Sequence, residues 1–455
     1  MTLSVVILAA GRGTRMNSNK PKVMHLLAGK PLLEHVIQQV KRLSPAAIYC
    51  VVGHERQVVM DALSHYPVKW VVQETMLGTG HAVLQALPQI DPHHRVLVLY
   101  GDVPLISATT LQSLLDSLEK QDLSLLTATV PDPHGLGRVV RDSVGKLLRI
   151  VEEKDASDEE RLIQEINTGV LAAMPGVLAE WLPKVTAENK QNEYYLPDVV
   201  NLAIAAGRPV SSCVARTQEE VLGVNTRAQL AKAERAFQQH CAEKVMQAGV
   251  SLTDPARFDL RGELVAGEDV VIESNVLLEG HVVLGSGTMI APNNLIKNSR
   301  IGQRVVIKAN CVIEDADIGD DCVIGPFARI RPKTVLENKV HIGNFVEVKQ
   351  TKVGSGSKAN HLSYLGDALI GERVNIGAGT ITCNYDGVNK YQTIIEEGAF
   401  IGSNTSLVAP VRVGVNATIG AGSTITKEAP DEMLTVARSR QTQVASWKRR
   451  KKEES

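Results

Sequence analysis

The first residues that could do chemistry lie near the amino terminus, where an apolar segment, Ser4 to Leu8, leads into a glycine-rich loop. The loop reads Gly11-Arg12-Gly13-Thr14-Arg15, and Pro21-Lys22 follow it. Glycines let backbone N–H groups converge on anionic oxygens, so this pattern favours phosphate binding. It is neither a P-loop, because the G-x-x-x-x-G-K-[ST] spacing is absent, nor a dinucleotide fingerprint, because the third glycine is missing. An ordinary tight turn is the alternative, against which Arg15 and Lys22 argue.

A carboxylate follows a second apolar segment in the same half of the chain. Val96 to Tyr100 leads through Gly101 into Asp102, and apolar residues resume at Val103. If the segment is a strand of a parallel sheet, Asp102 lies at its carboxyl end, where a hydrated Mg²⁺ and phosphate groups would bind. For this residue taken alone, an ordinary turn aspartate is the alternative.

The elements that must position these residues alternate between strand and helix patterns. We expect strands over 48–52, 68–73, 96–100 and 123–130, with helices over 31–43 and 109–120. This alternation predicts a Rossmann-like, mostly parallel α/β sheet with its ligand at the carboxyl ends of the strands. A pattern free of glycine and proline from Arg227 to Ala248, ended by Gly249, predicts a connecting helix that acts as a spacer.

The second half of the chain is organised by an aliphatic residue that returns every five or six positions. Such a period fits neither a helix nor a plain strand and predicts a β-solenoid with a coil of about 18 residues, stacked roughly nine times. The glycines that follow many of these positions suit corners or tightly stacked places. The repeating residues are Ile272, Leu278, Leu284, Ile290, Ile296, Ile301, Ile307, Ile313, Ile318, Ile324, Ile330, Ile342, Val348, Val353, Leu365, Ile370, Ile376, Ile395, Ile401, Leu407, Val413, Ile419 and Ile425.

Departures from the repeat are where function is expected in a regular solenoid. The period falters between Arg331 and Lys339, softens over 355–367, and is interrupted over 382–392, where we expect a loop to leave the coil. The first and third departures carry polar residues that a plain prism does not need.

Composition excludes several classes of function. The 455 residues carry a formal net charge of −1, so no global field favours nucleic acid or a membrane surface. The six cysteines form no C-x-x-C pair, which indicates reduced thiols in a cytoplasmic protein. The apolar run Leu3 to Ala10 is too short to cross a bilayer, so we expect no membrane insertion.

Several sequence blocks in the first half of the chain resemble those of the sugar-1-phosphate nucleotidyltransferases and occur in the same order. The repeats of the second half resemble the hexapeptide-repeat transferases. The blocks are LAAGRGTRM…PK (8–22), QETMLGTGHA (73–82), YGD (100–102), GLGR (135–138), VEEKDA (151–156), INTG (166–169) and GVN (223–225). Together the two halves resemble the family of bifunctional N-acetylglucosamine-1-phosphate uridylyltransferases and glucosamine-1-phosphate N-acetyltransferases. The resemblance implies synthesis of UDP-N-acetylglucosamine for peptidoglycan and lipopolysaccharide, a left-handed parallel β-helix, and a homotrimer. It also implies four parts: a uridylyltransferase domain (1–226), a connecting helix (227–250), an acetyltransferase domain (251–437) and a basic tail (438–455).

For uridylyl transfer, the resemblance implies in-line attack of the sugar phosphate on UTP, assisted by Mg²⁺. No general base is needed, because a phosphate whose second pKa is near 6 is already ionised at pH 7. By resemblance, Arg15 and Lys22 contact the phosphates, Asp102 and Asn225 hold Mg²⁺, Gln73, Gly78 and Thr79 recognise uracil, and Gly137, Glu152 and Asn167 hold the amino sugar. Leu8, Ala9, Ala10, Gly11, Tyr100 and Gly101 complete the substrate-binding set. His81, beside the uracil loop, is interpreted as structural.

For acetyl transfer, the substrate amine must be neutral, and a base raises its reactive fraction. His361 is the candidate, because the unperturbed pKa of histidine is about 6.5. By resemblance, Arg331 and Lys349 grip the phosphate of glucosamine-1-phosphate, and Tyr364, Asn375, Asn384 and Tyr385 surround the sugar and acetyl group. Acetyl-CoA, the co-substrate, would lie along Ala378, Asn384, Tyr385, Ser403, Ala421 and Arg438. No cysteine stands beside a base, so direct transfer is expected.

The solenoid has three alternative roles. It could serve only for assembly or regulation, it could be a scaffold that binds a partner, or it could be a zinc hydratase. His281, His341 and His361 are too scattered along the repeats for the last of these. The tail, which holds six basic and two acidic residues from Arg440 onward, is either solvated or reaches the coenzyme phosphates of a neighbouring subunit.

Overall fold

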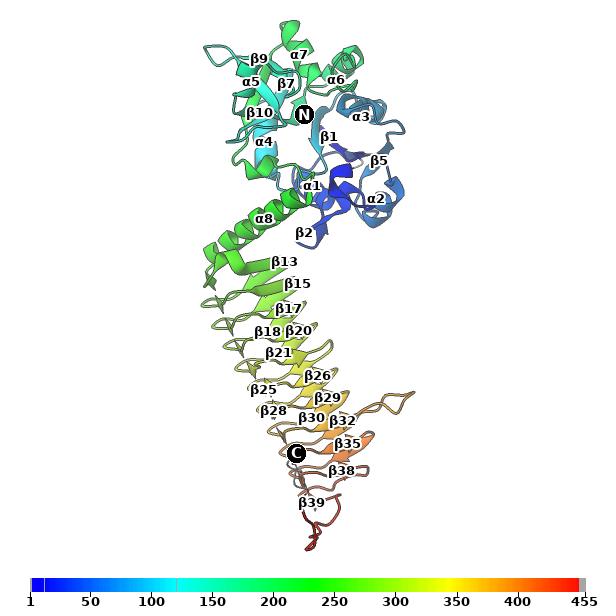
Figure 1. Ribbon diagram of the computed structural model, residues 1–455, viewed down its shortest axis with the longest axis vertical. Helices are drawn as coiled ribbons and strands as arrows, with labels where there is room; N and C mark the ends of the chain where they lie inside the picture. The colour runs from blue at the N-terminus through cyan, green and yellow to red at the C-terminus, as the bar shows by residue number, and fades with distance from the viewer. Residues whose placement is uncertain (1, 12, 120, 450–455) are drawn as a thin grey trace, which may run out of the picture. The chain divides into compact units, whose positions relative to one another are not determined.

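The computed structural model describes residues 2–11, 13–119 and 121–449, and divides the chain into two compact units, 1–237 and 238–455 (Figure 1). Arg12 of the glycine-rich loop, Lys120 and the last six residues of the basic tail lie outside the described residues. None of the described helices combines the length and apolarity needed to cross a bilayer.

The first unit is built on a mixed sheet whose central strands are parallel. β1 pairs in parallel with β4 and β6, β4 with β5, and β7 with β11, whereas β10 runs antiparallel to β6 and β7. Two further strands extend from β10 as an antiparallel pair. The strands are β1 (Leu3–Leu8), β4 (Ala47–Val52), β5 (Lys69–Val72), β6 (Arg95–Tyr100), β7 (Leu123–Thr129), β8 (Gly137–Arg141), β9 (Leu147–Val151), β10 (Glu165–Ala173) and β11 (Val210–Val214), with a small hairpin of β2 (Leu26–Leu27) and β3 (Lys30–Pro31).

Helices cover both faces of this sheet because its strands are apolar on both sides. In β1, Val5 and Ile7 join the core beneath α1 and α4, and Val6 and Leu8 join the core beneath α3, α6 and α7. The predicted Rossmann-like α/β fold is therefore confirmed. The helices are α1 (Leu32–Lys41), α2 (Arg56–Ala62), α3 (Thr79–Ala86), α4 (Ala108–Asp116), α5 (Asp158–Arg161), α6 (Val177–Trp181) and α7 (Asp198–Ala205).

The predicted connecting helix is α8, Arg227–Gln247. In the first unit, Ala233 packs in a small core with Met16 and Leu27. In the second unit, Ala242 and Val245 join the core of the solenoid. The helix is therefore part of the packing of each unit, beyond the spacer role that the sequence suggests.

The second unit is a parallel β-helix with three faces, each built by strands stacked in register. The first face comprises β12 (Ser251–Leu252), β14 (Val271–Ile272), β16 (Met289–Ile290), β19 (Val306–Ile307), β22 (Val323–Ile324), β25 (His341–Asn344), β28 (Lys358–His361), β31 (Asn375–Ile376), β34 (Phe400–Ile401), β37 (Thr418–Ile419) and β39 (Leu434–Thr435). The second comprises β17 (Leu295–Lys297), β20 (Val312–Glu314), β23 (Arg329–Ile330), β26 (Glu347–Lys349), β29 (Tyr364–Gly366), β32 (Ile381–Cys383), β35 (Ser406–Val408) and β38 (Thr424–Ile425). The third comprises β18 (Arg300–Ile301), β21 (Asp317–Ile318), β24 (Val335–Leu336), β27 (Lys352–Val353), β30 (Ala368–Ile370), β33 (Thr393–Ile395) and β36 (Val411–Val413), and the long strands β13 (Phe258–Ala266) and β15 (Val276–Leu284) begin the second and third faces together.

The aliphatic repeat fills the interior of this prism. Ile290 stacks on Ile307, then on Ile324 and Ile342, so each coil takes 17 or 18 residues. Between Ile376 and Ile401 the coil takes 25 residues. The extra residues are the loop that the sequence predicts to leave the coil. The glycines serve stacking as well as corners, since a Cβ on Gly343 would lie 2.0 Å from the carbonyl oxygen of Asn360 in the next coil.

The prediction that the repeat falters between Arg331 and Lys339 is wrong. Leu336 is 1% exposed, belongs to β24 and pairs with Ile318 and Val353, so it continues the period. The expected softening and interruption are also smaller than predicted. Ala359 takes the aliphatic position within 355–367, and the buried Thr382 takes the last repeat position before the loop leaves the coil. The Oγ1 atom of Thr382 accepts a hydrogen bond from the N–H of Gly366 at 2.7 Å.

Three corners separate the faces, and residues in left-handed backbone conformation turn each of them. The first corner, between the first and second faces, is turned by Asn293, Asn310, Phe327, Phe345, Leu362, Gly379, Asn404 and Gly422. The second corner, between the second and third faces, is turned by Gly280, Asn298, Asp315, Lys333, Gln350 and Asp367. The third corner, which returns to the first face, is turned by Gly287, Arg304, Asp321, Lys339, Gly356, Arg373, Gly398 and Asn416.

Candidate active sites

The candidate nucleotide site lies at the carboxyl edge of β1, β5 and β6. Leu8 and Tyr100 are in register, and Gly101 N–H donates to Leu8 O at 2.9 Å, so the segments that follow β1 and β6 leave the sheet together. A Cβ on Gly53 would lie 3.1 Å from Ala10 Cβ and 3.4 Å from Gln73 O. The fold therefore brings Gln73 beside the loop that follows β1.

Lys22, Asp102 and Asn225 form the polar centre of this edge. The Lys22 ammonium contacts the Asp102 carboxylate and donates to Asn225 Oδ1 at 2.9 Å. Val224 N–H donates to the backbone carbonyl of Asp102 at 2.9 Å, which fixes the two oxygen donors relative to one another. A carboxylate and an amide oxygen that converge on one cation are donors that suit Mg²⁺. The residues predicted to hold this ion therefore fit it.

The glycine-rich loop lies against Lys22. Gly13 has φ of +64°, and a Cβ there would lie 2.6 Å from Lys22 Cβ, so this glycine permits the loop to approach Lys22. Arg15 is exposed and has no ion-pair partner among the residues that the structure describes. It is therefore free to meet a phosphate that enters at this edge.

The expected uracil loop is held by main-chain contacts and by Gln73. The Gln73 side chain is buried, and its Nε2 lies 3.2 Å from Gly78 O and 2.9 Å from His81 Nδ1. Thr79 Oγ1 accepts from Leu196 N–H at 3.0 Å. The contact between His81 and Gln73 is one that residue spacing did not reveal.

The expected amino-sugar residues meet across β8, β9 and β10. Asn167 is in register with Gly137, and a Cβ on Gly137 would lie 3.2 Å from Glu152 Oε1. Burial raises the pKa of Glu152, and the nearby carboxylates of Asp198 and Asp155 raise it further. Sequence reasoning missed Asp198, because only the packing of α7 against β9 brings it here.

The candidate acetyl-transfer base lies at the first corner of the β-helix. The exposed His361 ends β28, and its Nδ1 lies 3.0 Å from Asn344 Oδ1 in the coil before. An amide oxygen accepts, so Nδ1 carries the ring proton and Nε2 keeps a lone pair. Asn344 was not predicted, although its position 17 residues before His361, one coil length, is the signal that could have found it.

Four of the six predicted acetyl-CoA residues lie along the same corner, in successive coils. Gly379 N–H donates to His361 O at 3.3 Å, and Asn404 N–H donates to Ala378 O at 2.7 Å. Gly422 N–H donates to Ser403 O at 2.8 Å, and Arg438 Nη1 donates to Ala421 O at 2.6 Å. Ala378, Ser403, Ala421 and Arg438 are therefore brought into one ladder with His361.

The predicted phosphate-binding residues gather at the second corner. Lys349 Nζ lies 3.5 Å from Asp367 Oδ2, the Asn384 amide donates to the same oxygen, and Arg331 donates to Glu347 at 2.7 Å. The Lys349 ammonium, in hydrogen-bond contact, lowers the pKa of Lys390, a residue that the sequence did not single out. Crowded cations around one carboxylate are a suitable site for a phosphate.

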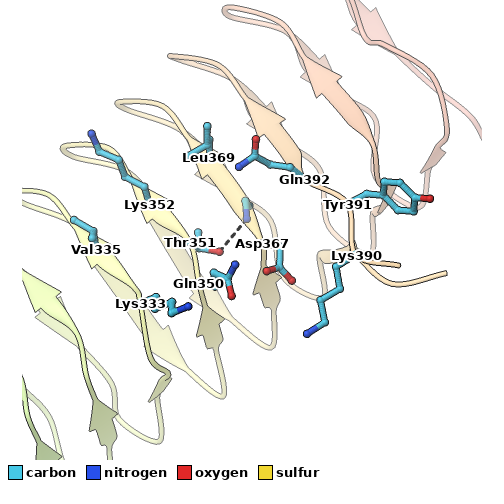
Figure 2. Close-up of a pocket in the computed structure, with 11 residues that line it drawn as sticks. Lys333, Val335, Gln350, Thr351, Lys352, Asp367, Leu369, Lys390, Tyr391 and Gln392 are labelled. Carbon is cyan, nitrogen blue, oxygen red and sulfur yellow. Dashed lines mark hydrogen bonds between the residues drawn. The ribbon is translucent and has the colours of Figure 1, made fainter. Parts of the chain in front are cut away.

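Lys390 also borders a shallow cavity of about 400 Å³ on the other side of this corner, where its side chain projects near Asp367 (Figure 2). Arg331 and Lys349 do not line this cavity, but Asp367 and Lys390 do, so it adjoins the phosphate cluster. The lining residues are Lys333, Val335, Gln350, Thr351, Lys352, Asp367, Ala368, Leu369, Lys390, Tyr391 and Gln392.

Of the remaining predicted residues, Asn375 lies away from both clusters, whereas Tyr385 adjoins the phosphate cluster through Lys390. Asn375, in β31, pairs on the first face with Lys358 and Phe400. Tyr385 is exposed in the loop that leaves the coil, where it bridges to Lys390 and donates its hydroxyl to Gly387 O.

Within one chain, the two groups of predicted acetyl-transfer residues lie at different corners of the prism. His361 is at the first corner and Asp367 at the second, and strand β29 lies between them. The base and coenzyme ladder therefore belongs to one edge of the prism, and the phosphate cluster belongs to another.

Comparison with known proteins agrees with both halves. A model of the MobA-like NTP transferase domain matches residues 5–186, one of the GMPPB C-terminal domain matches 260–355, and one of the hexapeptide repeat of succinyl-transferase matches 392–427. The bifunctional protein GlmU of Methylococcus capsulatus is 53% identical and covers 99% of this chain and 98% of its own length. That of Marinobacter nauticus is 52% identical and covers 99% of each chain. The chain belongs to the GlmU family.

As a member of this family, the chain is a bifunctional transferase, with a nucleotidyltransferase in its first unit and a hexapeptide-repeat acyltransferase in its second. The alternatives that give the solenoid only an assembly or scaffold role do not apply.

A crystal structure of a putative glucose-1-phosphate thymidylyltransferase from Bacillus anthracis aligns with 51% of this chain and 94% of its own, at a TM-score of 0.42 and 17% identity. No conclusion rests on that similarity.

Proposed function

We propose that the second unit acetylates glucosamine-1-phosphate with acetyl-CoA and that the first unit transfers UMP from UTP to the product, which gives UDP-N-acetylglucosamine. The observation that supports this most strongly is the convergence of Lys22, Asp102 and Asn225 at the edge where β1 and β6 end. We retain the four-part division at 226, 250 and 437 as part of this proposal. Six free cysteines and a need for UTP and acetyl-CoA favour the cytoplasm.

In uridylyl transfer, a phosphate oxygen of the sugar phosphate bonds to the α-phosphorus of UTP, and the bond to the β-phosphate breaks to release pyrophosphate. Lys22 and Arg15 neutralise the phosphates that meet at this edge. Asp102 and Asn225 would hold Mg²⁺, which supplies further charge neutralisation when bound. Gln73 with the Gly78-Thr79 loop would read the base.

The amino sugar would lie over Gly137, Glu152 and Asn167, which the sheet places together. Because burial raises the pKa of Glu152, this carboxyl stays protonated at higher pH than an exposed one and can donate to a sugar oxygen.

In acetyl transfer, the amine nitrogen bonds to the thioester carbonyl carbon, the coenzyme thiolate leaves, and His361 Nε2 takes the amine proton. Asn344 holds the ring proton on Nδ1, so Nε2 is the free acceptor. Arg331, Lys349 and Lys390 would bind the sugar phosphate. The ladder from Ala378 to Arg438 would carry the coenzyme.

We propose a homotrimer of left-handed β-helices in which the first corner of one chain faces the second corner of its neighbour. The residues that turn the first corner support this arrangement. Phe327, Phe345 and Leu362 are 48%, 56% and 63% exposed, and all have positive φ, which is costly for bulky side chains. The other corners use glycine or polar residues there. A strained apolar strip beside His361 is best explained by burial against a second copy.

To test this, purified protein is incubated with Mg²⁺, UTP, acetyl-CoA and glucosamine-1-phosphate, and one of these components is omitted at a time. Free thiol and pyrophosphate are followed separately. Thiol should appear without UTP, and pyrophosphate only after the acetylated sugar phosphate has formed. If pyrophosphate forms from the unacetylated sugar as fast as from the acetylated one, the proposed order of the two reactions is wrong.

A further inference from the structure

The Gln73 side chain has an orientation that its neighbours fix. Its Nε2 lies 3.2 Å from the backbone carbonyl oxygen of Gly78, which can only accept a hydrogen bond. The nitrogen and not the oxygen of the amide must therefore face the loop. The same Nε2 lies 2.9 Å from His81 Nδ1, so both amide protons are used, one by Gly78 and one by His81.

This arrangement also fixes which ring nitrogen of the neutral His81 carries the hydrogen. Nδ1 accepts the Gln73 proton, so the proton of the neutral ring is on Nε2. The side-chain nitrogen of Gln85 lies 3.2 Å from that ring nitrogen and also donates to the backbone carbonyl oxygen of His81 at 3.4 Å. His81 Nδ1 therefore acts on Gln73 as a hydrogen-bond acceptor.

The remaining polar atom, Gln73 Oε1, is the acceptor left for a ligand at this edge of the sheet. No donor among the described residues reaches it, yet it is not one of the side-chain atoms sealed from solvent without a partner. Gln73 follows β5 and lies with Gly53 against Ala10, in the loop after β1. Both amide protons of Gln73 are already used, so only its acceptor oxygen remains for the base of a nucleotide.

We propose that His81 is a positioning residue that sets the Gln73 amide to read a pyrimidine with a protonated N3, and so selects UTP over CTP. Uracil N3 carries a hydrogen that Oε1 can accept. Cytosine N3 carries a lone pair in that place, which would oppose the oxygen. Without the acceptor on His81, only the 3.2 Å contact with the Gly78 carbonyl still favours this orientation, so the amide turns over more readily and offers its N–H to cytosine. The inference rests on the proposed contact between Gln73 and the base.

The experiment measures kcat/KM of the full-length protein for UTP and for CTP in wild type, His81→Leu, His81→Asn, Gln73→Ala and Gln85→Ala. Where CTP turnover is too slow, its inhibition constant against UTP replaces it. His81→Leu should lower the UTP to CTP preference roughly tenfold to a hundredfold, because one buried hydrogen bond no longer fixes the amide. His81→Asn, whose Oδ1 can take the place of Nδ1, should restore most of the preference.

The control variant Gln85→Ala keeps Nδ1 as an acceptor and should change the preference little. If His81→Leu slows both nucleotides equally while its melting temperature stays that of the wild type, His81 is only structural and the inference is wrong. If Gln73→Ala also leaves the preference unchanged, the contact between Gln73 and the base is wrong, and the proposed uracil site fails with it.

Discussion

Asp102 and Asn225, which come from distant parts of the first unit's sequence, present their side-chain oxygens to the same atom, Lys22 Nζ. A backbone hydrogen bond of 2.9 Å from Val224 to Asp102 holds the two segments together. Their convergence is therefore built into the main chain and does not depend on the lysine. A cation that lies between them meets one formal negative charge and one neutral oxygen, which leaves positions for phosphate and water oxygens.

Asp102→Asn should lower the rate of pyrophosphate release by roughly a hundredfold or more, because the substitution removes the only negative charge of this donor pair. The rate of thiol release should stay that of the wild type, since Asp102 belongs to the first unit. Asp61→Asn, an exposed aspartate of α2, is the matched control and should leave both rates unchanged. Retention of a tenth of the wild-type pyrophosphate rate by Asp102→Asn would contradict this role.

A chelator should stop pyrophosphate release and spare thiol release. The proposed acetyl-transfer residues are a base, amides and cations, none of which is proposed to hold a metal, whereas Asp102 and Asn225 of the first unit are. Both rates are followed during a titration with EDTA, and Mg²⁺ in excess should restore the first. Equal loss of thiol release would show that the acetyl transfer also needs a divalent ion.

The stability of the first unit should fall with rising pH through Glu152. Burial raises the pKa of this carboxyl, with Asp198 and Asp155 adding to the effect. A carboxyl whose pKa is higher in the folded state contributes its full stability below the unfolded value, about 4.3, and loses that contribution as the pH rises through the folded value. Glu152→Gln removes this loss, so it should be more stable than the wild type at pH 7.

Urea unfolding at a series of pH values, followed by the fluorescence of Trp70 and Trp181, measures this difference in the first unit. Glu159→Gln, an exposed neighbour, is the control and should follow the wild type. Asp198, whose own pKa is raised by burial, should leave a residual slope in Glu152→Gln. Identical pH dependence in Glu152→Gln and wild type would refute the assignment.

The sequence predicted the two fold classes because both depend on periodic apolar residues. It missed Leu336 because, apart from Val335, polar and charged residues such as Lys333 and Glu337 stand close to it, although it is six positions from Ile330 and from Ile342. The site contacts were harder to predict. Lys390 meets Lys349 only because the loop after Thr382 returns to the second corner, and no periodicity gives the path of a loop. Likewise, the contact of His81 with Gln73 depends on side-chain conformation.

Leu336→Ala should destabilise the second unit by about 2–5 kcal/mol, because it leaves a cavity in the fully buried interior of the prism. Leu369→Ala is the matched control on the same face, where the side chain is 42% exposed, and should cost far less. Urea unfolding followed by circular dichroism compares the two. A loss for Leu336→Ala no larger than that of its control would mean that this position is not part of the core.

Subunits with different defects should restore acetyl transfer to one another. His361→Ala disables the first corner of its chain, and Lys349→Ala disables the second corner, so each homotrimer should be inactive in thiol release. In a mixed cyclic trimer, one of the three contacts joins an intact first corner to an intact second corner. Random co-assembly at equal amounts should therefore recover about a quarter of the wild-type rate. Pyrophosphate release should stay normal in every sample and report intact protein. If each chain built its site alone, co-expression would recover nothing, and the proposed arrangement of corners would have to be abandoned.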